Sequence, residues 1–207
     1  MPEPVRREAL AGTTCIACGV FRSFLDELRQ QGRFSLPTEY LPPHLHLYPL
    51  RLEELLTTQL NRQREHQHNV LLLYGDCCPH MTQLVDFAWG WRTPGTNCAQ
   101  IVLGHDEWRR LVRAGAFFLF ADWARNWHNI MTHIPGTDPQ TFIAIFREQH
   151  QRFIYLDPGT EAIPERDLDD CARHFGVPWE RRAISLDPLA TQLQAGIDHV
   201  VKRGNRR

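Results

Sequence analysis

The feature that most constrains the fold is a continuous apolar run in the first half of the chain, NVLLLYG at residues 69–75. A strand with one solvated face alternates polar and apolar residues, whereas a central parallel strand is buried on both faces and is apolar throughout. The run therefore predicts a strand at the centre of a parallel sheet. Parallel strands need crossover connections, which are usually helices, so strands and helices should alternate along the chain.

The flanking sequence shows this alternation. The segment 13–19 (TTCIACG) is a short apolar strand, and segment 20–32 behind it has apolar residues at helical spacing, ended by Gly32. The further predicted elements are an outer strand around residues 44–47, helices at 51–67, 81–90, 99–104 and 105–115, a strand at 115–120, helices at 121–131 and 141–150, a strand at 152–157, a helix at 165–175, and a last strand and helix beyond it.

This order of elements predicts a three-layer α/β fold of Rossmann-like type, with a mostly parallel sheet and helices on both faces. The length of 207 residues fits a single domain. We expect that domain to span residues 13–200, between an N-terminal extension (1–12) and a basic C-terminal tail (201–207).

Charge and hydropathy argue against two large classes of partner. The formal net charge of -1 provides no global field that would attract nucleic acid or a membrane surface. No apolar run approaches the roughly 18 residues of a membrane span, and the N-terminus has no apolar segment of signal-peptide type. We therefore expect a cytoplasmic protein. Thiols stay reduced there, so the six cysteines are interpreted as ligands, nucleophiles or core residues rather than disulfides.

The main functional signal is that a cysteine follows each of three candidate strands: Cys18, Cys77 and Cys98. The carboxyl ends of parallel strands lie along one edge of the sheet, where ligands bind, so these thiols should lie close together. Three thiolates hold zinc when a fourth ligand completes the tetrahedron, and they also hold an iron–sulfur cluster with one iron open. The sequence therefore predicts a zinc or iron–sulfur site at Cys18, Cys77 and Cys98.

Four residues are candidates for the fourth ligand of such a site. Cys78 is adjacent to Cys77, and neighbouring residues rarely bind one ion without strain. His80 lies three residues beyond Cys77, within reach if the turn is tight. Asp76 and His105 are the other two candidates.

Two other interpretations of the cysteines remain open. Cys77 and Cys98 each precede a predicted helix, whose N-terminus lowers a thiol pKa, so either one could be the nucleophile of a metal-free thiol enzyme. His80 or His105 would then supply the acid–base partner. Alternatively the cysteines are small buried hydrophobes, and the protein is a structural adaptor.

Three further residues near predicted strands or helices are interpreted as structural. Cys15 forms a C-x-x-C pair with Cys18, but spacing within a strand favours a core position for it. Cys171 lies on a predicted helix and is also assigned to the core. Asp157 follows a predicted strand and could place an acid at the same sheet edge, although the sequence Asp-Pro-Gly-Thr at 157–160 is typical of a turn.

Six short motifs occur in a fixed order along residues 13–190. They are Ala-Cys-Gly at 17–19, Leu-Leu-Tyr-Gly-x-Cys at 72–77, Asn-Cys at 97–98, Leu-Gly at 103–104, Gly-Ala-Phe-Phe-Leu at 115–119 and Trp-x-x-x-Trp at 123–127. In this set the chain resembles the uncharacterised prokaryotic family called domain of unknown function 1638. The resemblance implies a three-cysteine pattern that maps onto Cys18, Cys77 and Cys98.

The resemblance also implies a context of corrinoid-dependent methyl transfer, with a corrinoid contact and a corrinoid or methyltransferase protein as partner. The chain departs from the family pattern next to two of the cysteines. Cys78-Pro79-His80 replaces Gly-rich residues after the second cysteine, and Thr96-Asn97 replaces His-Asp before the third.

Overall fold

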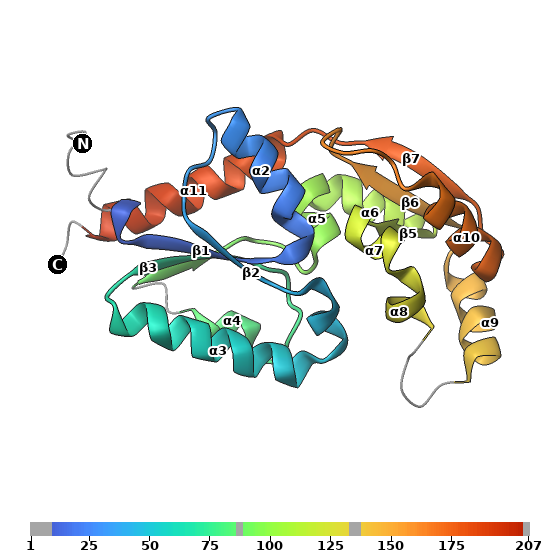
Figure 1. Cartoon of the computed structure of the whole chain (residues 1–207), viewed down its shortest axis with the longest axis horizontal. Coiled ribbons are helices and arrows are strands. Elements are labelled where there is room, and N and C mark those ends of the chain that lie inside the picture. The colour runs from blue at the N-terminus through green and yellow to red at the C-terminus, as the bar shows by residue number, and fades with distance from the viewer. Residues whose placement is uncertain (1–9, 86–88, 133–137, 205–207) are drawn as a thin grey trace. The chain divides into compact units, whose positions relative to one another are not determined.

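The computed structural model describes residues 10–85, 89–132 and 138–204, which form two compact units (Figure 1). The first unit contains the chain up to residue 101 together with the segment from residue 186 onward, and the second unit contains residues 102–185. Each unit is built on its own parallel sheet. The predicted α/β class with parallel strands is therefore confirmed, and the strands are divided between two sheets.

The first sheet has the strand order β2-β1-β3-β4, and all of its neighbours are parallel. These strands are β2 (Thr38–Leu41), β1 (Thr13–Cys18), β3 (Asn69–Leu73) and β4 (Gly90–Arg92). Every residue of β1 is buried, and so is β3 from its second residue onward. The apolar run at 69–75 thus contains a central parallel strand, as its composition predicts.

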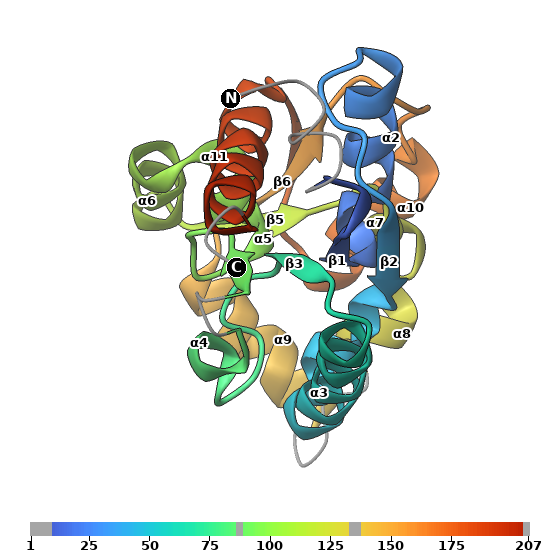
Figure 2. The same ribbon diagram turned by 90° about the vertical axis from the view of Figure 1, so that its left-hand side faces the viewer.

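Helices cover both faces of the first sheet, which gives this unit three layers (Figures 1 and 2). On one face lie α2 (Arg22–Gln30), reached through the 3-10 helix η1 (Gly19–Phe21), and α11 (Asp187–Gly204). On the other lie α3 (Pro49–Glu65) and the short α4 (Met81–Leu84). The predicted tail begins inside α11, because this helix continues through residue 204.

The predicted outer strand around residues 44–47 is wrong. This segment is the 3-10 helix η2 (Pro43–Leu47), and the outer strand β2 ends just before it. Pro42 and Pro43 explain the difference, because proline has no N–H to donate to a strand ladder and its fixed φ suits the first position of a helix.

The predicted helix over 81–90 is also wrong beyond its first turn. The helix ends at Leu84, Val85 is extended, and the strand β4 begins at Gly90. Residues 86–88 lie outside the described part of the chain. A short apolar run does not distinguish a strand from a helix by periodicity alone, and here pairing with β3 decides for the strand.

The second unit contains β5 (Ala116–Leu119), β6 (Arg152–Asp157) and β7 (Trp179–Ala183) in that order, all parallel. Its helices are α6 (His105–Arg113), α7 (Ala121–Arg125), α8 (Trp127–Met131), α9 (Pro139–Gln149) and α10 (Glu165–Phe175). An aromatic core surrounds Phe153 of β6, whose ring centroid lies 5.2 Å from Phe146 and 5.7 Å from Phe175. In the part of the chain that the structure describes, no helix is both long enough and apolar enough to cross a membrane.

Candidate functional site

The three cysteines singled out by the sequence all lie at the carboxyl edge of the first sheet. Cys18 is the last residue of β1, and Cys77 lies four residues after the end of β3. Cys98 is the first residue of α5 (Cys98–Leu103), which follows the turn after β4. Because β1, β3 and β4 are adjacent and parallel, these three connections leave the sheet on the same side.

The thiol of Cys98 links the other two. It shares one hydrogen bond with the Cys18 thiol and another with the Cys77 thiol. Cys18 is buried, whereas Cys77 and Cys98 are partly exposed. The structure therefore brings together the three cysteines that the sequence picks out from six, in the order Cys18–Cys98–Cys77. We call these residues the thiol cluster.

A close approach of two backbones holds Cys77 beside Cys98. A Cβ atom on Gly75 would lie 2.5 Å from the Asn97 Cα and 2.7 Å from the Thr96 carbonyl oxygen, so only glycine fits there. The Asp76 N–H donates to that same carbonyl, with an N···O distance of 2.8 Å. The turn after β3 and the turn after β4 are thus joined one residue before Cys77 and two residues before Cys98.

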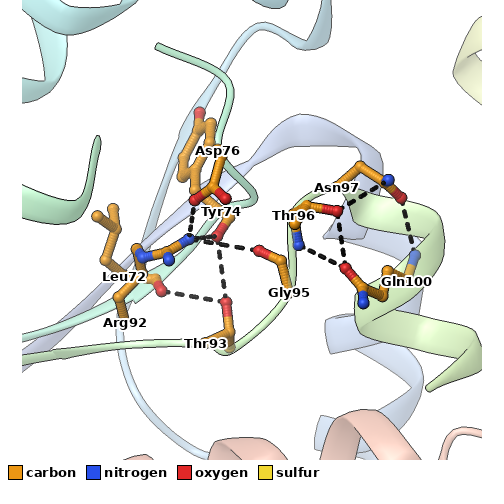
Figure 3. A network of polar contacts seen from close by, with 9 residues as sticks. All are labelled: Leu72, Tyr74, Asp76, Arg92, Thr93, Gly95, Thr96, Asn97 and Gln100. Atoms are coloured by element: carbon orange, nitrogen blue, oxygen red, sulfur yellow. Dashed lines mark hydrogen bonds and ion pairs between the residues drawn. The ribbon is translucent and has the colours of Figure 1, made fainter. Parts of the chain in front are cut away.

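Polar side chains fix the start of α5, which carries Cys98 (Figure 3). The Asn97 Oδ1 accepts from the Gln100 N–H at 2.9 Å, and the Gln100 Oε1 accepts from the Thr96 N–H at 2.6 Å. This reciprocal pattern resembles a capping box, which satisfies N–H groups that a helix start leaves without partners. It holds the backbone on both sides of Cys98.

Arg92, the last residue of β4, contacts both the turn after β3 and the turn after β4 (Figure 3). Its Nη1 lies 3.0 Å from the Asp76 Oδ1 and donates to the carbonyl oxygens of Tyr74, at 3.2 Å, and Gly95, at 3.4 Å. The Arg92 side chain is only 16% exposed. Arg92 therefore joins the segments that lead to Cys77 and Cys98, and places a positive charge near the thiols.

The contacts within the thiol cluster shift the pKa values of Cys77 and Cys98 in opposite directions. The hydrogen bond with Cys98 lowers the pKa of Cys77, and the Gly75 backbone and the Arg92 charge lower it further against burial and the Asp76 charge. The pKa of Cys98 lies well above its usual value. Its hydrogen bonds with Cys18 and Cys77 contribute most to this shift, and burial and the charges of the same two cysteines raise the pKa further. Cys77 is thus the more acidic thiol of this pair and Cys98 the less acidic one.

Tyr74 is a component of this site that the sequence reasoning missed. Its side chain is 2% exposed, and its hydroxyl has no hydrogen-bond partner within the described residues. Burial contributes most to raising the pKa of Tyr74. The charges of four cysteines raise it further: Cys18, Cys98, Cys77 and Cys78. The phenol group therefore lies near these sulfurs. Its position at the end of the apolar run, just before Gly-Asp-Cys, was the available signal.

The candidate fourth ligands have different surroundings. Cys78 is buried, and burial together with the Glu53 charge raises its pKa to about 11. The Nδ1 of His80 lies 2.8 Å from the Glu53 Oε1, with the His80 side chain 59% exposed. Asp76 is paired with Arg92. His105 belongs to the second unit.

The thiol cluster is a hydrogen-bonded chain rather than a preformed metal cage. Within residues 10–85, 89–132 and 138–204, no group of three or more His, Cys, Asp or Glu side chains has its donor atoms placed to hold a metal ion. The ligand role of Cys18, Cys77 and Cys98 therefore stays a prediction, while their proximity is a property of the structure.

The remaining cysteines occupy core positions. Cys15 in β1 and Cys171 in α10 are both fully buried, and burial raises the pKa of each thiol to about 12. Such thiols stay protonated and make poor nucleophiles or ligands, as the core interpretation expects.

Comparison with protein families gives one match, to the family described as "Protein of unknown function (DUF1638)", over residues 40–193. The chain belongs to this family. The DUF1638 match includes Cys77, Cys98, Tyr74 and Arg92, whereas Cys18 precedes it. Comparison with curated proteins and with solved structures found no match.

Proposed function

We propose that this DUF1638 protein binds a soft metal centre, either a zinc ion or an iron–sulfur cluster, through Cys18, Cys77 and Cys98. The observation that carries the proposal is that the Cys98 thiol hydrogen-bonds to both other thiols at the carboxyl edge of a parallel sheet. Thiolates are the ligands that zinc and iron–sulfur clusters prefer. Three ligands supplied singly by separate strand ends are typical of a functional site.

The hydrogen-bonded chain of sulfurs is the state expected before metal binding. A metal ion replaces thiol protons, so its binding releases protons and removes the S–H groups that link Cys98 to its neighbours. The backbone needs little change, because Gly75 and the α5 cap already hold the two turns together. The side chains of the three cysteines would turn from one another toward the ion.

Three thiolates leave a fourth coordination position. In zinc proteins this position is filled in structural sites and open in catalytic sites. Two groups that could fill it are the Tyr74 oxygen and the Cys78 thiol, since the charge of Cys77 acts on both. The contact of His80 with Glu53 occupies Nδ1 and leaves Nε2 as the nitrogen that could bind an ion.

The link to corrinoid-dependent methyl transfer is a separate proposal, and its support is the family resemblance alone. It names a corrinoid or a methyltransferase protein as the partner of the site. Mixing the protein with free cobalamin and recording the corrinoid spectrum tests the contact. A spectral change that is lost in Cys77→Ala supports it, and an unchanged spectrum argues against it.

Elemental analysis of protein purified without oxygen, together with its visible spectrum, tests the metal proposal. Iron with a broad sulfur-to-iron absorption in the visible range identifies a cluster. A colourless protein with stoichiometric zinc identifies a zinc site. Protein without either metal, which also takes up none on reconstitution with zinc or with iron and sulfide, contradicts the proposal.

A second candidate function is a metal-free thiol enzyme with Cys77 as nucleophile. The observation that favours it is the lowered pKa of Cys77, because the thiolate is the reactive form. Cys98 rather than a histidine then supplies the proton donor. This function uses Cys77 and Cys98 but gives Cys18 no role, so we rank it below metal binding.

A further inference from the structure

A second group of polar side chains lies at the carboxyl edge of the second sheet. Tyr155 of β6 is in register with Arg181 of β7, and Asp157 lies two residues beyond Tyr155. Residues two apart on a strand share a face, and residues in register on neighbouring strands share it too. The three side chains therefore project from one face of the sheet near its carboxyl end.

Asp157 organises this group. Its carboxylate is 2% exposed, accepts from the Arg181 Nε at 2.7 Å, and accepts from the Gly159 N–H at 2.8 Å. Both carboxylate oxygens therefore have partners within the protein. The sequence at 157–160 is typical of a turn, and the structure shows that Asp157 in this turn also fixes the Arg181 guanidinium.

A second arginine reaches the same place from α7. Arg125 forms an ion pair with Glu161 at 2.5 Å. The Arg125 side chain is 41% exposed and that of Arg181 is 54% exposed. A guanidinium has five N–H donors, so one carboxylate contact leaves each arginine with donors that solvent or a ligand can use.

Two buried hydroxyls in the segments that carry Asp157 and Glu161 have no partner in the described part of the chain. The Tyr155 hydroxyl and the Thr160 Oγ1 are buried and make no hydrogen bond within the described residues, and the Tyr155 side chain is fully buried. Burial raises the pKa of Tyr155 to about 12, and the charges of the two carboxylates and two guanidiniums act on it as well. The phenol oxygen therefore lies among the two ion pairs. Buried polar groups nearly always have partners, so the orphan Tyr155 hydroxyl, with the orphan Thr160 hydroxyl one residue before Glu161, indicates a missing partner.

We propose that this edge of the second sheet binds a small oxyanion, the phosphate or carboxylate group of a small molecule. The two hydroxyls and the remaining N–H groups of Arg125 and Arg181 are all donors, and guanidiniums bind planar oxyanions in a bidentate manner. The nearby carboxylates are neutralised by their own arginines. Ligands bind at the carboxyl edges of parallel sheets.

Both sheet edges carry a tyrosine and an aspartate paired with an arginine, but their other side chains differ. In the first unit Tyr74 and Asp76 follow β3, and the aspartate pairs with Arg92 of the neighbouring strand. In the second, Tyr155 and Asp157 lie at the end of β6, and the aspartate pairs with Arg181. The first edge adds three thiols to this pattern. The second adds a second arginine and no cysteine, which suits an anion.

Thermal unfolding of the full-length chain in inorganic phosphate, and separately in acetate, tests this proposal against chloride at equal ionic strength. Phosphate also stabilises proteins by exclusion from their surface, so only a saturable rise in Tm counts. A ligand at about ten times its Kd should raise Tm by about 3–6 °C in a chain of this size. A rise with phosphate, with acetate or with both identifies which oxyanion the site accepts.

Tyr155→Phe and Thr160→Val make the test specific. Each removes a hydroxyl without a partner, so the variants should fold and should melt no lower than wild type without ligand. We expect each to lose most of the saturable rise, and Tyr48→Phe, which changes an exposed tyrosine of the first unit, to keep it. No saturable rise in wild type with either anion, or an undiminished rise in both hydroxyl variants, would overturn the proposal.

Discussion

At the residue scale, the contacts within the thiol cluster give two chemically identical thiols, Cys77 and Cys98, different pKa values. The pKa of Cys98 is raised, that of Cys77 is lowered, and the Tyr74 hydroxyl has no hydrogen-bond partner within the described residues. Buried hydroxyls without partners destabilise a protein by about 1–3 kcal/mol. A buried tyrosine in this state is best explained by a form of the protein in which it has a partner.

The lowered pKa of Cys77 predicts its pH-dependent reactivity. Only the thiolate is alkylated, so the alkylation rate of Cys77 should rise with pH at a lower midpoint than that of an ordinary cysteine, and Cys98 should react more slowly than Cys77. Cys98→Ala removes the hydrogen bond that lowers the Cys77 pKa most, and should move the Cys77 midpoint to higher pH. Mass spectrometry of each peptide after timed iodoacetamide treatment of metal-free protein measures this. Faster labelling of Cys98 than of Cys77 would be inconsistent with the assignment.

Tyr74→Phe separates a role at the metal from a role in packing. Without metal the variant should be as stable as wild type or more so, because it loses an unpaired hydroxyl. With metal, the thiolates become strong acceptors, and loss of the hydroxyl should lower metal affinity about 10–100-fold, as for other groups that support ligands. Tyr155→Phe is the matched control, since it removes an equally orphaned hydroxyl from the second unit. Equal metal affinity in both variants would exclude a role for Tyr74.

At the element scale, the site depends on how two turns meet rather than on any one helix. Gly75 allows the close approach, and the Asn97 cap fixes the first turn of α5. Each of the three connections carries only one member of the cluster, so the register of the sheet determines whether the thiols meet. The sequence predicts β1 and β3 from their apolar runs, and from these the positions of Cys18 and Cys77.

Gly75→Ala should open the gap between the two turns. The new Cβ would lie 2.5 Å from backbone atoms of Asn97, which cannot move aside as a side chain can. We expect a loss of about 1–3 kcal/mol in the free energy of unfolding, as for other overpacked sites, together with weaker metal binding. Gly12→Ala is the control, because no heavy atom lies within 4 Å of its added Cβ. Urea unfolding and a zinc titration measure both effects, and equal stability of the two variants would refute the close approach.

Other parts of the site could not be predicted from the sequence, for physical reasons. The strand β4 is three residues long, and pairing with β3 rather than local pattern forms it. Tyr74 looks like any aromatic residue at the end of a buried strand, because burial alone does not show whether its hydroxyl has a partner. The contact of His80 with Glu53 joins residues 27 positions apart, which no local pattern encodes.

At the scale of the whole molecule, the chain builds two parallel sheets and returns to the first to complete it. The alternation of strands and helices predicts the α/β class, but it does not specify which strands share a sheet. The helix α11 closes the first unit against β3 and β4. Gly196 permits this, since a Cβ there would lie 2.4 Å from the Trp91 ring and 2.9 Å from a Leu71 methyl group.

The dependence of the first unit on α11 gives a prediction far from the cysteines in sequence. Gly196→Ala gains up to about 1 kcal/mol in helix propensity but forces its methyl group into Trp91 and Leu71, which costs about 1–3 kcal/mol. We expect a net loss of stability. Gln194→Ala, at an exposed position on the same helix, should change the free energy of unfolding by less than about 0.5 kcal/mol. Denaturant unfolding followed by tryptophan fluorescence measures both variants, and stabilisation by Gly196→Ala would contradict the packing.

The most direct test of the central claim is a zinc titration of reduced, metal-free protein with single cysteine variants. Wild type should bind one zinc ion, and Cys18→Ala, Cys77→Ala and Cys98→Ala should each weaken binding by more than ~100-fold, beyond the effect of losing an outer-shell group. Cys15→Ala and Cys171→Ala, at buried positions outside the cluster, should bind zinc as wild type does. Failure of wild type to bind zinc, or an equal effect of all five substitutions, would contradict the assignment of the three thiols to one metal site.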